Sequence, residues 1–256
     1  MAKNRANIAI FAIKITTMAL ILNLESSTEI CSVALSRDGE PVDFLESDEG
    51  QNHARLLSVF AQELMQRNQL KFDQLDAVAV SSGPGSYTGL RIGVSLAKGI
   101  CYANQIPLIA ISPLQAMSAH VLAQRQALGL PDSHELILCP MIDARRMEVY
   151  TARFNERLEE LHPVSAEIID ENIFSELEHQ IPVVYFGNGA AKCQPVVNRP
   201  NTWFVDDIRT SAQFMCSLSH KAFENKVFED LAYYEPFYLK DFIAGISQKN
   251  LLKPSH

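Results

Sequence analysis

The chain has 256 residues, of which 47% are apolar and 20% are charged. This composition can bury a globular core, and it excludes an intrinsically disordered chain, a collagen-like repeat and a coiled-coil array. The length fits one large domain or two small ones. With 22 Lys and Arg against 30 Asp and Glu, the net charge is −8. Such a chain lacks the basic surface with which proteins hold nucleic acids by themselves, so any role on RNA requires a partner.

The cysteines and histidines give no sign of a metal site. The five cysteines form no CxxC pair, and Cys31, Cys101 and Cys139 lie within apolar runs, which is typical of buried, reduced thiols in a cytoplasmic protein. The seven histidines show neither HExxH nor another ligand spacing, and a structural zinc site needs two close ligand pairs. We therefore predict no metal site and a cytoplasmic location.

Residues 1–17 differ in character from the rest of the chain. They carry Lys3, Arg5 and Lys14 but no acid, around a short apolar run from Ile8 to Ile13. Lys14 interrupts this run and no small-residue cleavage site follows, so the segment differs from a signal peptide. We expect a disordered or non-native extension, with the folded unit beginning at Met18.

The first half of the chain after Met18 predicts strands and helices in a recognisable order. Three strands are expected over 19–25, 30–36 and 42–46, and the Asp38-Gly39 pair predicts a tight turn between the second and the third. A helix over 52–68, a strand over 76–81, a helix over 90–104 and a strand over 107–112 follow. This order is that of a ribonuclease-H-like α/β domain.

The second half loosely repeats the scheme. We expect a helix over 112–128, with Ser112 as its N-cap and Pro113 at its first position. Two strands within 134–155 are joined near residues 143–146, and strands over 161–167 and 182–188 are separated by a short helix near 170–179. A helix from Ala190 and a final helix over 211–225, capped by Thr210, complete the chain. The sequence thus predicts an N-terminal lobe over 18–111 and a C-terminal lobe over 112–256.

An acid and three hydroxyls form the turn after the first strand, Glu25-Ser26-Ser27-Thr28. Hydroxyls and turn amides can donate hydrogen bonds to phosphate oxygens, and the acid could hold a metal bound to the phosphate. Serine and threonine are also ordinary turn residues. The turn by itself therefore fits either an anion site or a plain turn.

A glycine-rich loop over 81–89 lies where a strand ends and the next helix begins. Free amides and the positive end of the helix dipole favour an anion there. No lysine follows the last glycine, so this is not a Walker A loop, and the glycine spacing departs from the dinucleotide fingerprint. An ordinary strand-to-helix turn is the alternative. The residues expected at an anion or nucleotide site are Glu25, Ser26, Gly83, Gly85 and Ser86.

Small residues recur every four positions along the helix that follows, at Gly89, Gly93 and Ala97. Because a glycine inside a helix costs about 0.5–1 kcal/mol relative to alanine, two of them indicate that another backbone approaches closely. That backbone belongs either to the domain's own sheet or to another subunit. For the second alternative, the helices 52–67 and 88–103 would pair with two helices of a partner. The residues expected at this partner surface are His53, Leu56, Phe60, Leu64, Tyr87, Gly89, Arg91, Gly93 and Ala97.

Several segments together resemble the TsaB (YeaZ) family of bacterial tRNA threonylcarbamoyladenosine biosynthesis proteins. They are ILNLESSTEICSVAL, the helix start at His53, AVSSGPGSYTGLRIGVSLAKGI, PLIAIS and IDARRMEVY. The resemblance is dense over 18–150 and thinner beyond, where FGNGAAK and EPFYLKDF are similar to the family. Residues 1–17 have no counterpart in it, which agrees with a start at Met18.

The resemblance implies an ASKHA (actin-like ATPase) fold with two ribonuclease-H-like lobes, shared with a catalytic paralogue, TsaD. In that paralogue the strand equivalent to PLIAI leads into a paired histidine motif that binds a metal. The corresponding positions here are Pro113 and Met117, which offer no imidazole. The resemblance thus implies that this chain keeps the fold and lacks the catalytic centre.

The resemblance also implies a non-catalytic scaffold that pairs with TsaD and is joined by the ATPase TsaE. Together they transfer a threonylcarbamoyl group to N6 of the adenosine next to the anticodon in tRNAs that read codons beginning with A. No cofactor is then expected on the chain alone, with ATP or ADP bound in the complex. A homodimer is expected in the absence of partners, tRNA is contacted only through the complex, and no membrane is involved.

Two other interpretations remain open. The chain could be an enzyme active by itself, either an ASKHA-type phosphotransferase that uses Glu25 and the 83–89 loop or a glycoprotease-like hydrolase. No nucleophile-elbow motif supports a Ser-His-Asp triad. Alternatively, the chain could be an interaction module with no link to tRNA.

Overall fold

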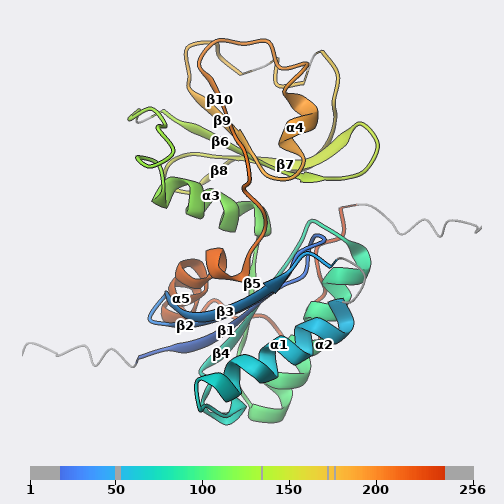
Figure 1. Cartoon of the computed structure of the whole chain (residues 1–256), viewed down its shortest axis with the longest axis vertical. Helices are drawn as coiled ribbons and strands as arrows, with labels where there is room; N and C mark the ends of the chain where they lie inside the picture. The colour runs from blue at the N-terminus through green and yellow to red at the C-terminus, as the bar shows by residue number, and fades with distance from the viewer. Residues whose placement is uncertain (1–17, 50–52, 134, 172, 176, 240–256) are drawn as a thin grey trace, which may run out of the picture.

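Two five-stranded sheets, each with its own helices, build two lobes that are stacked along the long axis (Figure 1). The computed structural model describes residues 18–49, 53–133, 135–171, 173–175 and 177–239. The expected hairpin turn is present: Asp38 and Gly39 have φ values of 52° and 85°, the positive pair that a tight two-residue turn requires.

The first sheet has the strand order β3-β2-β1-β4-β5, with β1 antiparallel to β2 and parallel to β4. This is the ribonuclease-H-like order that the sequence predicted. The strands are β1 (Leu20–Glu25), β2 (Cys31–Arg37), β3 (Glu40–Ser47), β4 (Ala77–Ser81) and β5 (Leu108–Ile111). The helices of this half are α1 (His53–Arg67), the 3-10 turn η1 (Phe72–Gln74) and α2 (Tyr87–Asn104).

The second sheet repeats this topology, because its order is β10-β9-β6-β7-β8, with β6 antiparallel to β7 and parallel to β9. Its strands are β6 (Ile137–Asp143), β7 (Glu148–Phe154), β8 (Glu160–Ile168), β9 (Val183–Phe186) and β10 (Thr202–Val205). Its helices are α3 (Pro113–Ala123) and α4 (Ala190–Cys193). The predicted fold class, two ribonuclease-H-like lobes of the ASKHA type, is confirmed.

The alternation of side chains along β1 explains how helices cover both faces of the first sheet. Leu20, Leu22 and Leu24 pack with α1 and α2 on one face, while Ala19 and Ile21 face the opposite side, as the two-residue period of a strand dictates. Figure 1 shows α1 and α2 on the face that points away from the second lobe, and α5 and α3 between the two sheets.

The division at residue 112 needs a correction at the C-terminal end. The last helical elements, η2 (Ala212–Met215) and α5 (Cys216–Glu224), return to the first sheet, where Met215 and Leu218 pack with Ile21 and Ala79. The inner face of that sheet is apolar, and the described helices of the first half, α1 and α2, lie on the other face (Figure 1), so the chain must return to cover it.

Four local expectations differ from the structure. Within 170–179, the described residues form turns and no helix. The strand β10 was missed, although Trp203-Phe204-Val205 is a short aromatic and β-branched run of the kind that strands favour. The N-cap of the last helical segment is Ser211, whose side chain accepts from Gln213 N, and not Thr210. The helix that begins with Ser112 ends at Ala123, well before 128.

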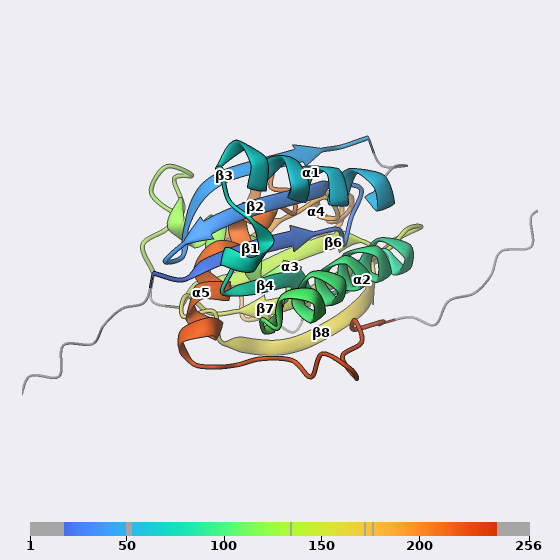
Figure 2. The same cartoon turned by 90° about the horizontal axis from the view of Figure 1, so that it is seen from below.

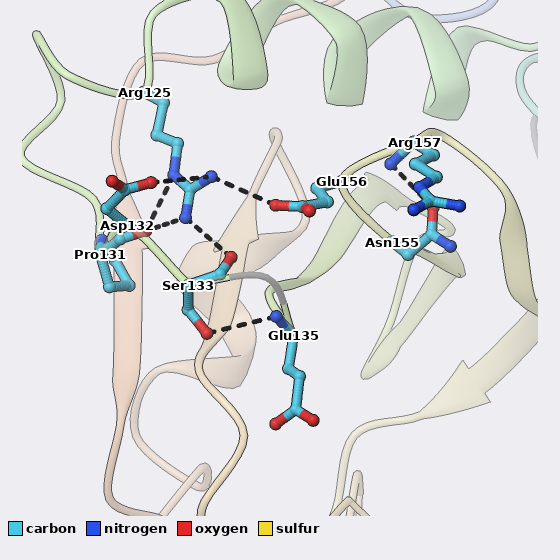
Figure 3. A network of polar contacts seen from close by, with 8 residues as sticks. All are labelled: Arg125, Pro131, Asp132, Ser133, Glu135, Asn155, Glu156 and Arg157. Carbon is cyan, nitrogen blue, oxygen red and sulfur yellow. Dashed lines mark hydrogen bonds and ion pairs between the residues drawn. The ribbon is translucent and has the colours of Figure 1, made fainter.

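A polar network around Arg125 holds the connection after α3 (Figure 3). The guanidinium donates to the carbonyl oxygens of Pro131 and Ser133 and lies 3.4 Å from a carboxylate oxygen of Glu156. Glu156 belongs to the turn between β7 and β8, where Asn155 accepts from the Arg157 amide at 2.9 Å. One arginine therefore ties the end of α3 to a hairpin of the second sheet.

Within the described ranges, no helix combines the length and the apolar character that a membrane crossing requires.

Candidate functional site

The serine turn between β1 and β2 packs directly on the glycine-rich loop between β4 and α2. The amide of Ser86, the N-cap of α2, donates to the carbonyl oxygen of Ser27 at 2.6 Å. The Ser26 hydroxyl donates to the Gly89 carbonyl at 2.9 Å, and the Ser26 amide donates to the Ser81 hydroxyl at 3.3 Å. Two features that the sequence suggested separately are thus parts of one packed unit.

The glycines of the loop before α2 and of α2 itself make room for this turn. A Cβ added at Gly85 would overlap the carbonyl oxygen of Ser27, and one added at Gly89 would overlap the carbonyl oxygen of Ser26. A Cβ at Gly93 would overlap the Ser26 hydroxyl and lie 3.3 Å from a Val80 methyl group. The glycines indicated a close approach either by the domain's own backbone or by another subunit. The structure shows the first, since the approaching backbone is that of the chain's own serine turn.

Four residues expected at the partner surface therefore lie inside the first lobe, and the prediction for them is wrong. Leu64 and Ala97 are fully buried in its core, and Gly89 and Gly93 are buried against the serine turn. The helical spacing of these positions was correct, but the face that they share points inward.

The expectation of an open anion site is also corrected. Glu25 and Ser26 have no exposed surface, and Glu25 Oε1 accepts the Ser27 amide at 2.6 Å. Gly83 faces the backbone of Phe237, whose carbonyl oxygen is 2.5 Å from where a Cβ would be. Glu25, Ser26, Gly85 and Ser86 do come together, but the Glu25 carboxylate and the Ser27 carbonyl oxygen already accept from the Ser27 and Ser86 amides, two donors that a phosphate would use.

Burial raises the pKa of Glu25 above its ordinary value of 4.5, and hydrogen bonds such as the one from Ser27 oppose this only in part. A carboxyl whose pKa is raised by folding binds its proton more tightly in the folded state than in the unfolded state. Its contribution to stability is full below pH 4.5 and is lost as the pH rises through the raised value.

Glu25→Gln is therefore expected to flatten the pH dependence of stability, because glutamine is neutral throughout and can still accept the Ser27 amide. The free energy of unfolding, measured in denaturant from about pH 4 to about pH 8, should fall less steeply in the variant than in the wild type. Glu63→Gln, at an exposed position of α1, is the control. Parallel curves for Glu25→Gln and wild type would contradict the prediction.

A groove with a volume of about 590 Å³ lies on the outer side of α1 and α2, on the same lobe. It is lined by Ser58, Tyr87, Thr88, Arg91, Ile92, Ser95 and Leu96. Of the residues predicted for the partner surface, Tyr87 and Arg91 line this groove. Leu56 and Phe60 are half-buried and pack against the core of the first lobe. The side chain of His53 lies outside the described residues.

The outward face of α2 carries a stripe that the sequence reasoning missed: Thr88, Ile92, Ser95, Gly99 and Tyr102. These positions follow one another at intervals of three and four residues, so they share one helix face. Three of them line the groove, and Tyr102 is 80% exposed. Apart from the neighbouring residues and the backbone of α2 itself, no described atom lies within 4 Å of the place where a Gly99 Cβ would be. A sequence signal for this second face exists: Gly99 is a third glycine in the helix, and it falls outside the Gly89–Gly93–Ala97 stripe.

A second, more polar cleft of about 360 Å³ lies where the chain crosses between the lobes. One wall is the end of β3 and the residue after it, Glu46 to Asp48, and the other consists of residues from the segment Asp207 to Phe214. Beside it, Thr28 and Thr210 share a hydrogen bond of 2.7 Å, and Asn188 donates to Glu29 at 3.1 Å. In the part of the chain that the structure describes, no group of three or more His, Cys, Asp or Glu side chains could hold a metal ion.

Comparison with known proteins agrees with this architecture. The family model described as "TsaD: tRNA N6-adenosine threonylcarbamoyltransferase" matches residues 47–247. Two curated relatives are named tRNA threonylcarbamoyladenosine biosynthesis protein TsaB. The one from Haemophilus influenzae is 36% identical over 130 residues, 51% of each chain. The one from Bacillus subtilis is 30% identical over 175 residues, 66% of this chain and 70% of the relative.

The solved structure of YeaZ from Pseudomonas aeruginosa has the same fold, with a TM-score of 0.73 at 23% identity, over 87% of this chain and 100% of that one. The match to the Haemophilus influenzae protein spans about half the length of that relative. The family model covers well over half of the chain, and the Bacillus subtilis match covers 70% of that protein. The chain therefore belongs to the tRNA N6-adenosine threonylcarbamoyltransferase (TsaD) family and, within it, to the TsaB (YeaZ) group.

Proposed function

We propose that the chain is a non-catalytic subunit of the complex that installs N6-threonylcarbamoyladenosine in tRNA, next to the anticodon of tRNAs that read codons beginning with A. Its catalytic partner would be a TsaD subunit, with the ATPase TsaE as a third component. The names of its relatives support a role in this pathway, and membership of the TsaD family supports a partner with the same fold.

The local structure supports a subunit without a catalytic centre. Pro113 and Met117 stand at the positions where the resemblance expects the imidazole ligands of the paralogue. Pro113 is buried at the start of α3, and Met117 packs in the core of the second lobe. Neither side chain offers an imidazole nitrogen to a metal. Transfer activity by this chain alone, or zinc or iron bound to it in stoichiometric amount, would contradict the proposal.

The partner surface is the outer face of α1 and α2. The observation that supports this assignment is an exposed glycine within α2, Gly99. A glycine within an exposed helix face costs about 0.5–1 kcal/mol relative to alanine, and nothing described in this chain needs the space. A facing helix that approaches closely does need it. Ile92 and Tyr102 flank the small residues Ser95 and Gly99, so a helix pair from a partner of the same fold can complete a four-helix contact. A second copy of the chain would use the same face when the partner is absent.

The proposal also assigns tRNA and nucleotide binding to the assembled complex. Because the net charge is −8, tRNA is contacted through the assembled complex, whose other subunits supply the cations. No cofactor binds the chain alone, and ATP or ADP belongs to the complex.

Gly99→Leu is expected to weaken association with the TsaD subunit by about tenfold to a hundredfold, because overpacking a close contact costs about 1–3 kcal/mol. The fold should be retained, since the position is exposed. The measurement is titration calorimetry with the TsaD subunit from the same genome, with circular dichroism of each variant. Gly99→Ala, with one methyl group, is the matched control and should bind within about threefold of wild type.

The cellular test replaces the chromosomal gene by Gly99→Leu or Gly99→Ala and measures threonylcarbamoyladenosine in total tRNA. The leucine variant should lower the modification and the alanine variant should retain it. Undiminished modification after depletion of the chain would contradict the proposed function and favour an interaction module with no link to tRNA.

A further inference from the structure

The C-terminal segment Glu229–Leu239, here called the strap, is attached to the outside of the first lobe at three points. The Glu229 amide donates to the Leu108 carbonyl at 2.9 Å, beside the edge strand β5. Lys98 of α2 donates to the Ala232 carbonyl at 3.3 Å, and the Phe237 amide donates to the Ser82 carbonyl at 2.7 Å. In Figure 2 the strap is the red trace that runs from α5 along the lower side of the molecule.

Apolar side chains fix the strap in this course. Leu231 and Tyr234 pack against the same core that α1 and α2 cover. Near the other end, Gly83, with a φ of +98°, gives the strap room, since its missing Cβ would lie 2.5 Å from the Phe237 carbonyl oxygen. The strap therefore reaches the first turn of α2 by a path that both its backbone and its side chains determine.

At that point the strap adds an aromatic ring to the rim of the groove. The ring centroids of Tyr238 and Tyr87 are 4.8 Å apart, with the planes tilted by 42°. The Tyr87 hydroxyl accepts from Arg91 Nη1 at 2.9 Å, and the guanidinium carbon lies 5.3 Å from the centroid of the same ring. Tyr87 is thus held between Tyr238 and Arg91, and its position limits where the guanidinium can lie.

Among the described residues that line the groove, Arg91 supplies the only charge. It is exposed, and no carboxylate of the described residues forms an ion pair with it. In a chain with a net charge of −8, a cation held in place without an acidic partner is suited to receive a carboxylate from outside, because guanidinium and carboxylate form two parallel hydrogen bonds.

We propose that the strap is a third element of the association surface: Tyr238 positions Tyr87 and, through it, Arg91, which binds a carboxylate of the partner subunit at the rim of the α1–α2 groove. This inference rests on the proposed function, because the occupant is the TsaD-type subunit that docks on the outward face of α2. Tyr238 is a positioning residue, and Arg91 makes the contact.

The test compares Tyr238→Ala with Tyr238→Phe in the full chain, by titration against the TsaD subunit. Tyr238→Ala should weaken binding about fivefold, the size of an ion pair at an interface rim. Tyr238→Phe keeps the ring and should restore the wild-type affinity. Tyr233→Ala, which removes a tyrosine of the strap that is 84% exposed, is the matched control and should bind as wild type does.

Salt dependence supplies a second readout that a purely structural role would not change. Wild-type affinity should fall as salt rises from about 50 to about 500 mM, because screening weakens an exposed ion pair. The fall should be smaller in Arg91→Gln and in Tyr238→Ala. If Tyr238→Ala keeps wild-type affinity and salt dependence while Gly99→Leu binds weakly, the strap inference is overturned and the proposed surface stands. If Gly99→Leu also binds like wild type, the proposed surface itself is wrong.

Discussion

Gly89→Ala is expected to destabilise the protein by about 3 kcal/mol or more, because the added methyl group cannot be accommodated by a side-chain movement. The Cβ would overlap the carbonyl oxygen of Ser26, which belongs to the backbone of the serine turn. That turn is held to the first turn of α2 by the hydrogen bond from Ser86 N to Ser27 O. Relief of the overlap therefore requires separation of the turn from the helix, with loss of their mutual hydrogen bonds.

A glycine-to-alanine substitution at Gly99 should instead stabilise the protein. Gly99 lies in the same helix, and no described atom outside its neighbours and the backbone of α2 lies within 4 Å of the Cβ position. Alanine there therefore brings only its better helix propensity, worth about 0.5–1 kcal/mol. Urea unfolding of both variants and the wild type, followed by circular dichroism, measures the pair. Equal stability of Gly89→Ala and wild type would mean that the glycine stripe does not serve the serine turn.

Asn23→Ala is expected to cost about 2–4 kcal/mol, since it removes two buried hydrogen bonds between side chains and opens a cavity. Asn23 lies in the middle of β1 and has no exposed surface. Its amide nitrogen donates to the Ser36 hydroxyl at 3.0 Å, and its amide oxygen accepts from the Ser219 hydroxyl of α5 at 2.7 Å. The side chain thus ties the returning helix α5 to the first sheet.

A double-mutant cycle separates this bond from the rest of the effect. Ser219→Ala alone should cost less than Asn23→Ala, and the double variant should cost less than the sum, because the two side chains share one hydrogen bond. Asn225→Ala, at an exposed asparagine just after α5, is the control and should change stability by less than about 0.5 kcal/mol. An Asn23→Ala variant as stable as this control would contradict the assigned role.

The order of elements could be predicted because it depends on short-range patterns. The two-residue period of β1 and β2, the Asp38-Gly39 turn and the Ser112-Pro113 helix start are each readable within a few residues of sequence. Those patterns were sufficient for the ribonuclease-H-like order of the first sheet. They failed at β10, Thr202–Val205, whose side chains are only half-buried at the edge of the second sheet. Its run begins with a polar threonine, so it lacks the continuous apolar character that marks the equally short strands β5 and β9.

The candidate surface shows most clearly what the sequence alone could determine. Helical spacing established that Gly89, Gly93 and Ala97 share one face of α2, and that a close approach occurs there. It could not determine which face points inward, because α2 has a second small-residue stripe around Gly99, about 120° around the helix from Gly93. Only the tertiary structure decided this, by packing the Ser26–Ser27 backbone against the first stripe. That contact joins segments some 60 residues apart in the chain, and the spacing of residues within a single helix carries no information about such a partner.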